Sequence, residues 1–82
     1  MIVVQVNVPR FDTSYNFKLD EDTPIGLLLE DMVSVICQKE RRKAEFNSSG
    51  FVLVNLMSQS FLTQNLTLYE NGVKSGDVLE LI

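Results

Sequence analysis

The longest helical pattern of apolar and polar residues runs from Thr23 to about Lys39. Its apolar residues fall at offsets of 0, 3, 4, 7 and 11, the spacing of a helix face that packs on a core, and they are Ile25, Leu28, Leu29, Met32 and Ile36. Thr23 suits the N-cap and Pro24 the first helical position, while Glu30 and Asp31 are expected to face water. We therefore predict one amphipathic helix.

Two runs of alternating apolar and polar residues precede this helix and predict a β-hairpin. In the first run the inward residues are expected to be Ile2, Val4, Val6 and Val8. Pro9 ends this run, and residues 12–14 supply turn chemistry. In the second run the inward residues are expected to be Tyr15, Phe17 and Leu19. Since a hairpin alone is marginal in water, its inward face should share one core with the helix.

The segment after the helix contains two or three further short strands. Residues 51–56 are nearly continuous in apolar side chains, with Phe51 and Leu53 on one face and Val52 and Val54 on the other. Residues 59–62 suit a short edge strand, residues 67–69 a turn or 3₁₀ piece, and Asn71 with Gly72 a turn. Residues 78–82 predict a last strand whose inward residues are Leu79 and Leu81, with Glu80 pointing outward.

One helix between strand pairs indicates an α+β fold, with a mixed sheet of four to five strands. The length of 82 residues and the absence of a linker predict a single domain over residues 1–82. The net charge of −4 argues against nucleic acid as a partner, because phosphates require a basic surface. The composition is otherwise that of a globular protein.

Cysteine usage and the start of the chain favour the cytosol. Cys37 is the single cysteine, so it has no partner for an internal disulfide, and it is expected to be a small buried thiol. Residues 1–8 lack the charged region and cleavage site of a secretory signal. No apolar run approaches the roughly 18 to 20 residues of a membrane span, so direct membrane insertion is not expected.

Basic residues gather at the end of the predicted helix. The cluster consists of Lys39, Arg41, Arg42 and Lys43. Cations at a helix C-terminus interact favourably with its dipole, so one interpretation is a solvated cap. The other is an electrostatic docking site for an acidic partner or an anionic membrane surface.

The order of hairpin, helix, strand, short strand, turn and last strand resembles ubiquitin and the β-grasp fold over essentially the whole chain. The spacing of Thr67, Leu68, Val73, Leu79 and Leu81 is similar to the end of ubiquitin. Among ubiquitin-like proteins the chain resembles the bacterial YukD/EsaB family, accessory components of the type VII secretion system, on the closing segment 72–82. The resemblance implies a cytosolic, non-enzymatic protein that binds other parts of the secretion machinery or regulates it.

Two other functions, a ubiquitin-like modifier or sulfur carrier and an enzyme, fit these residues less well than an interaction module. A ubiquitin-like modifier or sulfur carrier activates a flexible C-terminal diglycine, whereas Ile82 is expected to end a paired strand. An enzyme is not expected, because the chain has no histidine and no phosphate-cradling loop, so neither catalytic residues nor a cofactor is predicted. The neighbouring carboxylates Asp20, Glu21 and Asp22 suit helix capping better than a metal site.

If the third and last strands are neighbours in a β-grasp sheet, four apolar residues share its outer face. These are Val52, Val54, Val78 and Ile82. Clustered apolar residues on a surface tend to mark interfaces, whereas scattered ones are ordinary. We therefore predict that this patch contacts a protein partner or a second copy of the chain.

Overall fold

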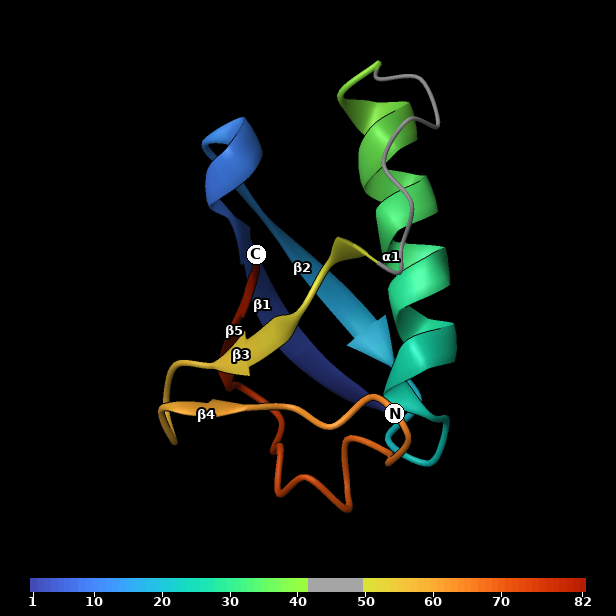
Figure 1. Ribbon diagram of the computed structural model, residues 1–82, viewed down its shortest axis with the longest axis vertical. Coiled ribbons are helices and arrows are strands. Elements are labelled where there is room, and N and C mark those ends of the chain that lie inside the picture. Colours follow the sequence, from blue (N-terminus) through green and yellow to red (C-terminus); the bar gives the residue numbers. More distant parts are fainter. Residues whose placement is uncertain (42–49) are drawn as a thin grey trace.

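The computed structural model describes residues 1–41 and 50–82 and shows a mixed sheet packed on one helix (Figure 1). The elements are β1 (Ile2–Val8), the 3₁₀ turn η1 (Pro9–Phe11), β2 (Thr13–Leu19), α1 (Ile25–Lys39), β3 (Leu53–Asn55), β4 (Ser60–Phe61) and β5 (Val78–Leu81). The five strands lie in the order β2-β1-β5-β3-β4, with β1 and β5 parallel and the other pairs antiparallel. This is the predicted α+β arrangement.

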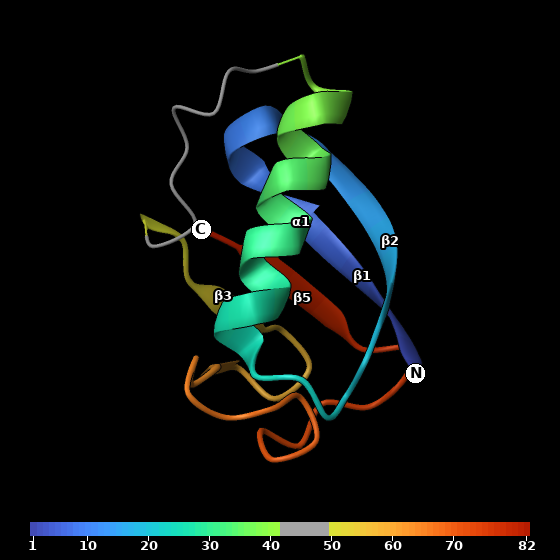
Figure 2. The same ribbon diagram turned by 90° about the vertical axis from the view of Figure 1, so that its right-hand side faces the viewer.

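The predicted hairpin of β1 and β2 forms, with the expected residues on its inward face. Val4 pairs with Phe17 and Val6 with Tyr15, so the inward side chains of both strands lie on one face. That face is covered by α1, which crosses in front of the sheet in Figure 2. The even residues of β1 from Val4 to Val8 are buried, and the aromatic residues of β2 are half-buried against the same core. The alternation in the sequence therefore identified the core face of both strands.

The apolar face of α1 is buried as predicted and is wider than the predicted stripe. The five predicted residues from Ile25 to Ile36 are buried, and Val33 and Cys37 join them. Glu30 and Asp31 are exposed. The burial of Cys37 confirms the expectation of a small core thiol.

The predicted start of the helix was wrong in its capping. The Thr23 hydroxyl donates to Asp20 over 3.1 Å, and Pro24 occupies the N-cap without a side-chain cap. The first helical amides instead donate to backbone carbonyls of the segment after β4: Ile25 to Leu66 over 2.9 Å and Gly26 to Gln64 over 3.0 Å. Because these carbonyls satisfy amides that lack partners within the helix, a side-chain cap is not required.

The strands after the helix are shorter than predicted but have the expected faces. β3 covers three residues of the predicted 51–56, and β4 covers two of the predicted 59–62 at the edge of the sheet. Phe51 and Leu53 are buried, as are Leu79 and Leu81 of β5. Val52 and the outer residues of β5 do not share that core face.

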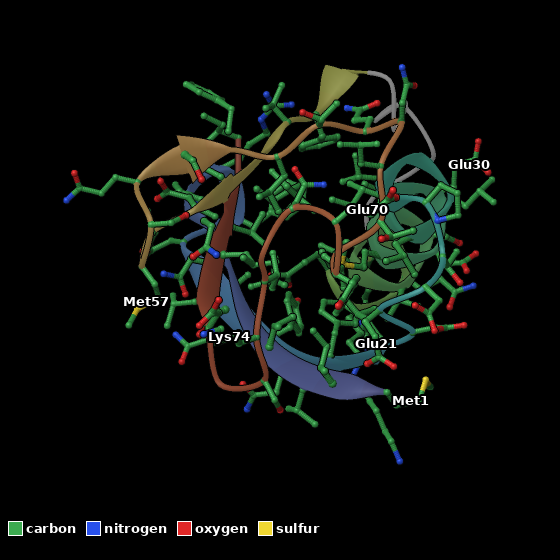
Figure 3. All side chains as sticks on the ribbon, turned by 90° about the horizontal axis from the view of Figure 1, so that it is seen from below. Met1, Glu21, Glu30, Met57, Glu70 and Lys74 are labelled. Atoms are coloured by element: carbon green, nitrogen blue, oxygen red, sulfur yellow. The ribbon has the colours of Figure 1, made fainter. Side chains whose placement is uncertain are left out.

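Segment 62–77 lies below the sheet and reaches the start of α1 (Figure 3). Leu68 and Val73 anchor it in the core. The Asn71 side chain donates to the Thr67 carbonyl over 2.8 Å, and Gly72 has a φ of 75°, which confirms the predicted turn. The segment therefore links the sheet to the helix N-terminus.

Asn55 is a buried polar residue within the predicted apolar strand. Its side-chain amide donates to the Asp77 carboxylate over 3.1 Å, and its side-chain oxygen accepts from the Met57 N–H over 2.9 Å. Asp77 also accepts from the Lys74 N–H over 3.0 Å. These bonds fix the turn after β3 to the segment that enters β5.

Candidate protein-interaction surface

The predicted binding patch lies on the face of the sheet that points away from α1. β3 and β5 are neighbours, as predicted, and Val54 lies opposite Glu80. Val52 and Ile82 exchange backbone hydrogen bonds of 2.8 and 2.9 Å. Successive side chains of a strand point to opposite faces, and the intervening residues are buried in the core. The structure therefore places the four predicted residues on one outer face: Val52, Val54, Val78 and Ile82.

Two further apolar residues extend this surface. Phe61 of β4 pairs with Val54 and is 71% exposed. Leu56, which follows β3, donates its N–H to the Val78 carbonyl over 2.9 Å and is partly exposed. Sequence reasoning missed Phe61, although an aromatic residue within a predicted edge strand was the available signal. We call the six residues the outer patch: Val52, Val54, Leu56, Phe61, Val78 and Ile82.

The outer patch has a polar boundary on the same sheet. Glu80 lies between Val54 on β3 and Asn7 on β1, and Gln5 lies beside Val78. Gln5 donates to the Asn7 side chain over 2.9 Å. The outer face is thus apolar over β3, β4 and the ends of β5, and polar at Gln5 and Asn7 of β1, whereas Val3 of that strand is apolar and 47% exposed. An apolar centre beside a polar rim is the usual arrangement of a protein interface.

The structure describes part of the basic cluster. Lys39 is the last residue of α1 and Arg41 follows with a φ of 52°; both are exposed. The Lys39 ammonium lies 5.9 Å from the ring centroid of Tyr15, a cation–π distance. Arg42 and Lys43 lie outside the described residues. The contact of Lys39 with β2 adds a packing role to the expected interaction with the helix end.

The three carboxylates before α1 lie within 4.8 Å of one another. Asp20 accepts from the Asp22 N–H over 3.0 Å and from the Thr23 hydroxyl, and these hydrogen bonds lower the pKa of its carboxyl group. Glu21 pairs with the Met1 ammonium over 2.9 Å (Figure 3). They therefore stabilise the turn before the helix, whereas we expected them to cap the helix itself.

The remaining chemically reactive side chains have structural surroundings. Cys37 lies on the buried face of α1, in the core. Burial raises the pKa of the Tyr15 hydroxyl, and the nearby Glu40 carboxylate raises it further. A phenol with a raised pKa remains protonated over the physiological range, so Tyr15 contributes packing and hydrogen bonding.

Solved structures with the same fold include three ubiquitin-like proteins, each with a TM-score of 0.75. The EccD5 ubiquitin-like domain from Mycobacterium xenopi is 23% identical, and the match covers 99% of this chain and 91% of that one. The N-terminal ubiquitin-like domain of the 4931431F19Rik protein is 17% identical, with 99% and 72% covered. A designed protein based on human erythrocytic ubiquitin is 16% identical, with 100% and 90% covered. These likenesses confirm the ubiquitin-like β-grasp fold.

Family membership follows from the sequence match rather than from the fold. Comparison with individually curated proteins gives no significant match. Within the described residues, no helix combines the length and apolar character that crossing a membrane requires. The family model described as "WXG100 protein secretion system (Wss), protein YukD" matches residues 2–81. The chain therefore belongs to the YukD family, ubiquitin-like components of the WXG100, or type VII, secretion system.

Proposed function

We propose that this chain is a non-enzymatic protein-interaction module that acts in the cytoplasm as an accessory or regulatory component of the secretion system. The observation that carries the proposal is the outer patch, in which Phe61 and Val54 lie side by side on adjacent strands. Ile82 is 44% exposed and Val52 37%, so the apolar surface continues across β3 and β5. The partner is another component of the secretion machinery.

The centre of the outer patch combines a branched apolar and an aromatic side chain, Val54 and Phe61. Aromatic and branched apolar side chains that lose water at the centre of an interface supply most of its binding energy. Val54 is half-buried between Phe61 and Glu80, so an aspartate there introduces a charge that a bound partner would desolvate. Its side chain points away from the core, so the folded domain tolerates the change.

Affinity capture from lysate of the native cells tests the proposal, with bound proteins identified by mass spectrometry. The parent should recover components of the secretion membrane complex, and Val54→Asp should lose them while its circular dichroism is unchanged. Asn65→Asp is the matched control, because it adds the same charge at an exposed position of the segment after β4 and should retain binding. Retention of the same components by folded Val54→Asp would exclude the outer patch.

Two other contacts are distinguished by further measurements. If the basic cluster is the docking site, reversal of Arg41 and Arg42 to glutamate abolishes capture, and binding of the parent weakens steeply with added salt. If the patch joins two copies of the chain, the parent sediments as a homodimer and Val54→Asp as a monomer. Either result would assign the contact to a different surface or partner from the one proposed.

We further propose that the chain is not conjugated to other proteins, in contrast to a ubiquitin-like modifier or sulfur carrier. The backbone of Ile82 is hydrogen-bonded to Val52 in both directions, so this residue belongs to the sheet rather than to a flexible arm. Intact-mass measurement of the chain recovered from cells should give the unmodified polypeptide. A ladder of covalent adducts, or recovery of an adenylating enzyme, would favour the alternative.

A further inference from the structure

A groove separates β2 from the first half of α1, on the opposite side of the sheet from the outer patch. Its volume is about 340 Å³. The apolar lining comes from both elements, namely Phe17 and Leu19 of β2 and Leu28, Met32 and Val35 of α1. Phe17 is half-buried and Val35 exposed, whereas the other three form a buried floor. The groove therefore offers apolar surface to a ligand without any rearrangement of the core.

The strand beside this groove is an edge of the sheet. Gln5 donates its N–H to Asp77 and Val3 accepts from Gly76, so odd residues of β1 direct their backbone groups toward β5. The even residues of β1 consequently bond to the odd residues of β2. The backbone groups of Asn16 and Lys18 then point outward, and no described strand lies beyond β2. Such an edge accepts an added strand.

The charged residues at the groove indicate which charge an added strand should carry. Asp20 and Asp31 line the groove and are exposed, and neither forms an ion pair with a described residue. Glu21 is already paired with the Met1 ammonium. Met1 and Lys18 also contribute to the lining; because the Met1 ammonium is paired with Glu21, two carboxylates face one cation there that has no ion pair with a described residue. A basic residue on the ligand is therefore complementary to this end of the groove.

The opposite end of the interface between β2 and α1 is occupied by the protein's own side chains. The Tyr15 ring lies beneath the Lys39 ammonium, which bridges from the end of α1. Tyr15 also packs against Phe17, with ring centroids 6.1 Å apart. This arrangement confines the open apolar surface to the part of the groove next to Phe17 and Leu28.

We propose that the groove between β2 and α1 binds an extended segment of a partner protein, which adds to the free edge of β2. The segment carries apolar side chains at alternate positions, which enter the groove, and a lysine or arginine at the end that meets Asp20 and Asp31. This site is separate from the outer patch, so one chain is able to hold two protein segments at once.

Synthetic peptides provide the test. They carry valine, isoleucine, leucine or phenylalanine at alternate positions, serine or threonine between them, and either lysine or glutamate at one end or the other. Lysine-ended peptides should shift the amide resonances of Asn16, Lys18 and the Leu28–Val35 part of α1, and should bind roughly tenfold more tightly than glutamate-ended ones. Absence of binding by every peptide, or equal binding of both series, would overturn the proposal.

Two matched controls separate this site from other surfaces. Asp31→Lys should reverse the preference so that glutamate-ended peptides bind better, since the changed side chain is exposed at the groove. The best peptide is N-methylated in two versions, one at the odd-numbered and one at the even-numbered backbone nitrogens. One version should lose binding and the other should keep it, because every second amide of an added strand faces β2. Equal effects of the two methylation patterns on binding would contradict strand addition.

The Val54→Asp variant makes the result independent of the proposed function. It should bind the lysine-ended peptides as the parent does, since Val54 lies on the other face of the sheet. Resonance shifts centred on Val54 and Phe61 would show that the peptides bind the outer patch and would contradict a site in the groove.

Discussion

At the scale of residues, Asn55 holds together two turns that the sequence pattern treats separately. Its side chain is 1% exposed, and it bonds to Asp77 before β5 and to Met57 after β3. A buried polar group is tolerated only when its hydrogen bonds are satisfied. The position of the β3–β4 turn relative to β5, and thus the outer patch above them, depends on this side chain.

Replacing Asn55 with alanine should lower the free energy of unfolding by about 2 kcal/mol, because two hydrogen bonds of a buried side chain are lost. Urea unfolding of the parent and variant measures the difference. Asn65→Ala is the control, since Asn65 is exposed, and it should change the value by less than about 0.5 kcal/mol. Equal stability of the Asn55 and Asn65 variants would show that the buried network is dispensable.

Asp20 gives a pH-dependent prediction at the same scale. Hydrogen bonds from the Asp22 N–H and the Thr23 hydroxyl lower its pKa from the ordinary 3.8, so folding favours the ionised form. Its contribution to stability is therefore present above the ordinary pKa and is lost as the pH falls through the lower folded value. Carboxyl NMR titration should give a midpoint below 3.8 for Asp20. Thr23→Val should raise that midpoint; an unchanged value would remove the hydroxyl as a cause.

At the scale of elements, the segment after β4 both completes the core and caps α1. Leu68 is fully buried in it, and the preceding carbonyls of Gln64 and Leu66 accept from the first helical amides. An isolated bridge between Pro24 and Thr67 joins the same two regions. The helix start is therefore defined by a segment about forty positions later in the chain.

Leu68→Ala should destabilise the fold by about 3 kcal/mol, because the lost side chain leaves a cavity in the core. The neighbouring Tyr69 is 74% exposed, and Tyr69→Ala should change the stability by less than about 0.5 kcal/mol. Thermal and urea unfolding of both variants check this contrast. Similar losses for the two variants would contradict the role of Leu68 as the anchor of this segment.

The elements also show what the sequence was able to predict. The inward faces of the hairpin and of the helix follow from local periodicity, since Val4 and Leu29 are buried and Phe17 packs against the same core, as their spacing predicts. The cap of α1 was mispredicted, because its partners Gln64 and Leu66 are backbone carbonyls brought close only by folding. Side-chain patterns carry no information about such contacts.

The outer patch was likewise predicted in part from the sequence. Val52, Val54, Val78 and Ile82 were grouped correctly on one face, because alternation and the expected neighbouring of β3 and β5 determine that face. Phe61 was missed, since its place depends on the register of the two-residue β4 against Val54. The groove beside β2 could not be predicted, because it depends on the distance between α1 and the edge of the sheet, and sequence periodicity does not give that distance.

At the scale of the whole molecule, helix, sheet and the segment after β4 contribute to one hydrophobic core. The single domain predicted for residues 1–82 should accordingly unfold in one cooperative step. Circular dichroism at the helix band and fluorescence of Tyr15 and Tyr69 should give coincident urea transitions. Separate midpoints for the two signals would instead indicate two folding units.

The two outer surfaces give the molecule its proposed role as a connector within the secretion machinery. The outer patch and the groove lie on opposite sides of the sheet. The groove combines apolar residues with the carboxylates of Asp20 and Asp31, whereas the outer patch consists of six apolar residues. Partners of different chemistry are therefore expected at the two sites. The outer patch is the main proposed binding surface, since it combines the predicted residues with an exposed aromatic side chain.

Photo-crosslinking in native cells is the most direct test of binding through the outer patch. A photoreactive amino acid placed at Phe61 on the outer patch is compared with one placed at Tyr69, which is exposed on the segment after β4. We expect specific adducts with a secretion-system component from position 61, lost when Val54→Asp is added, and none from position 69. Adducts that arise equally from both positions, or that persist with Val54→Asp, would contradict binding through the outer patch.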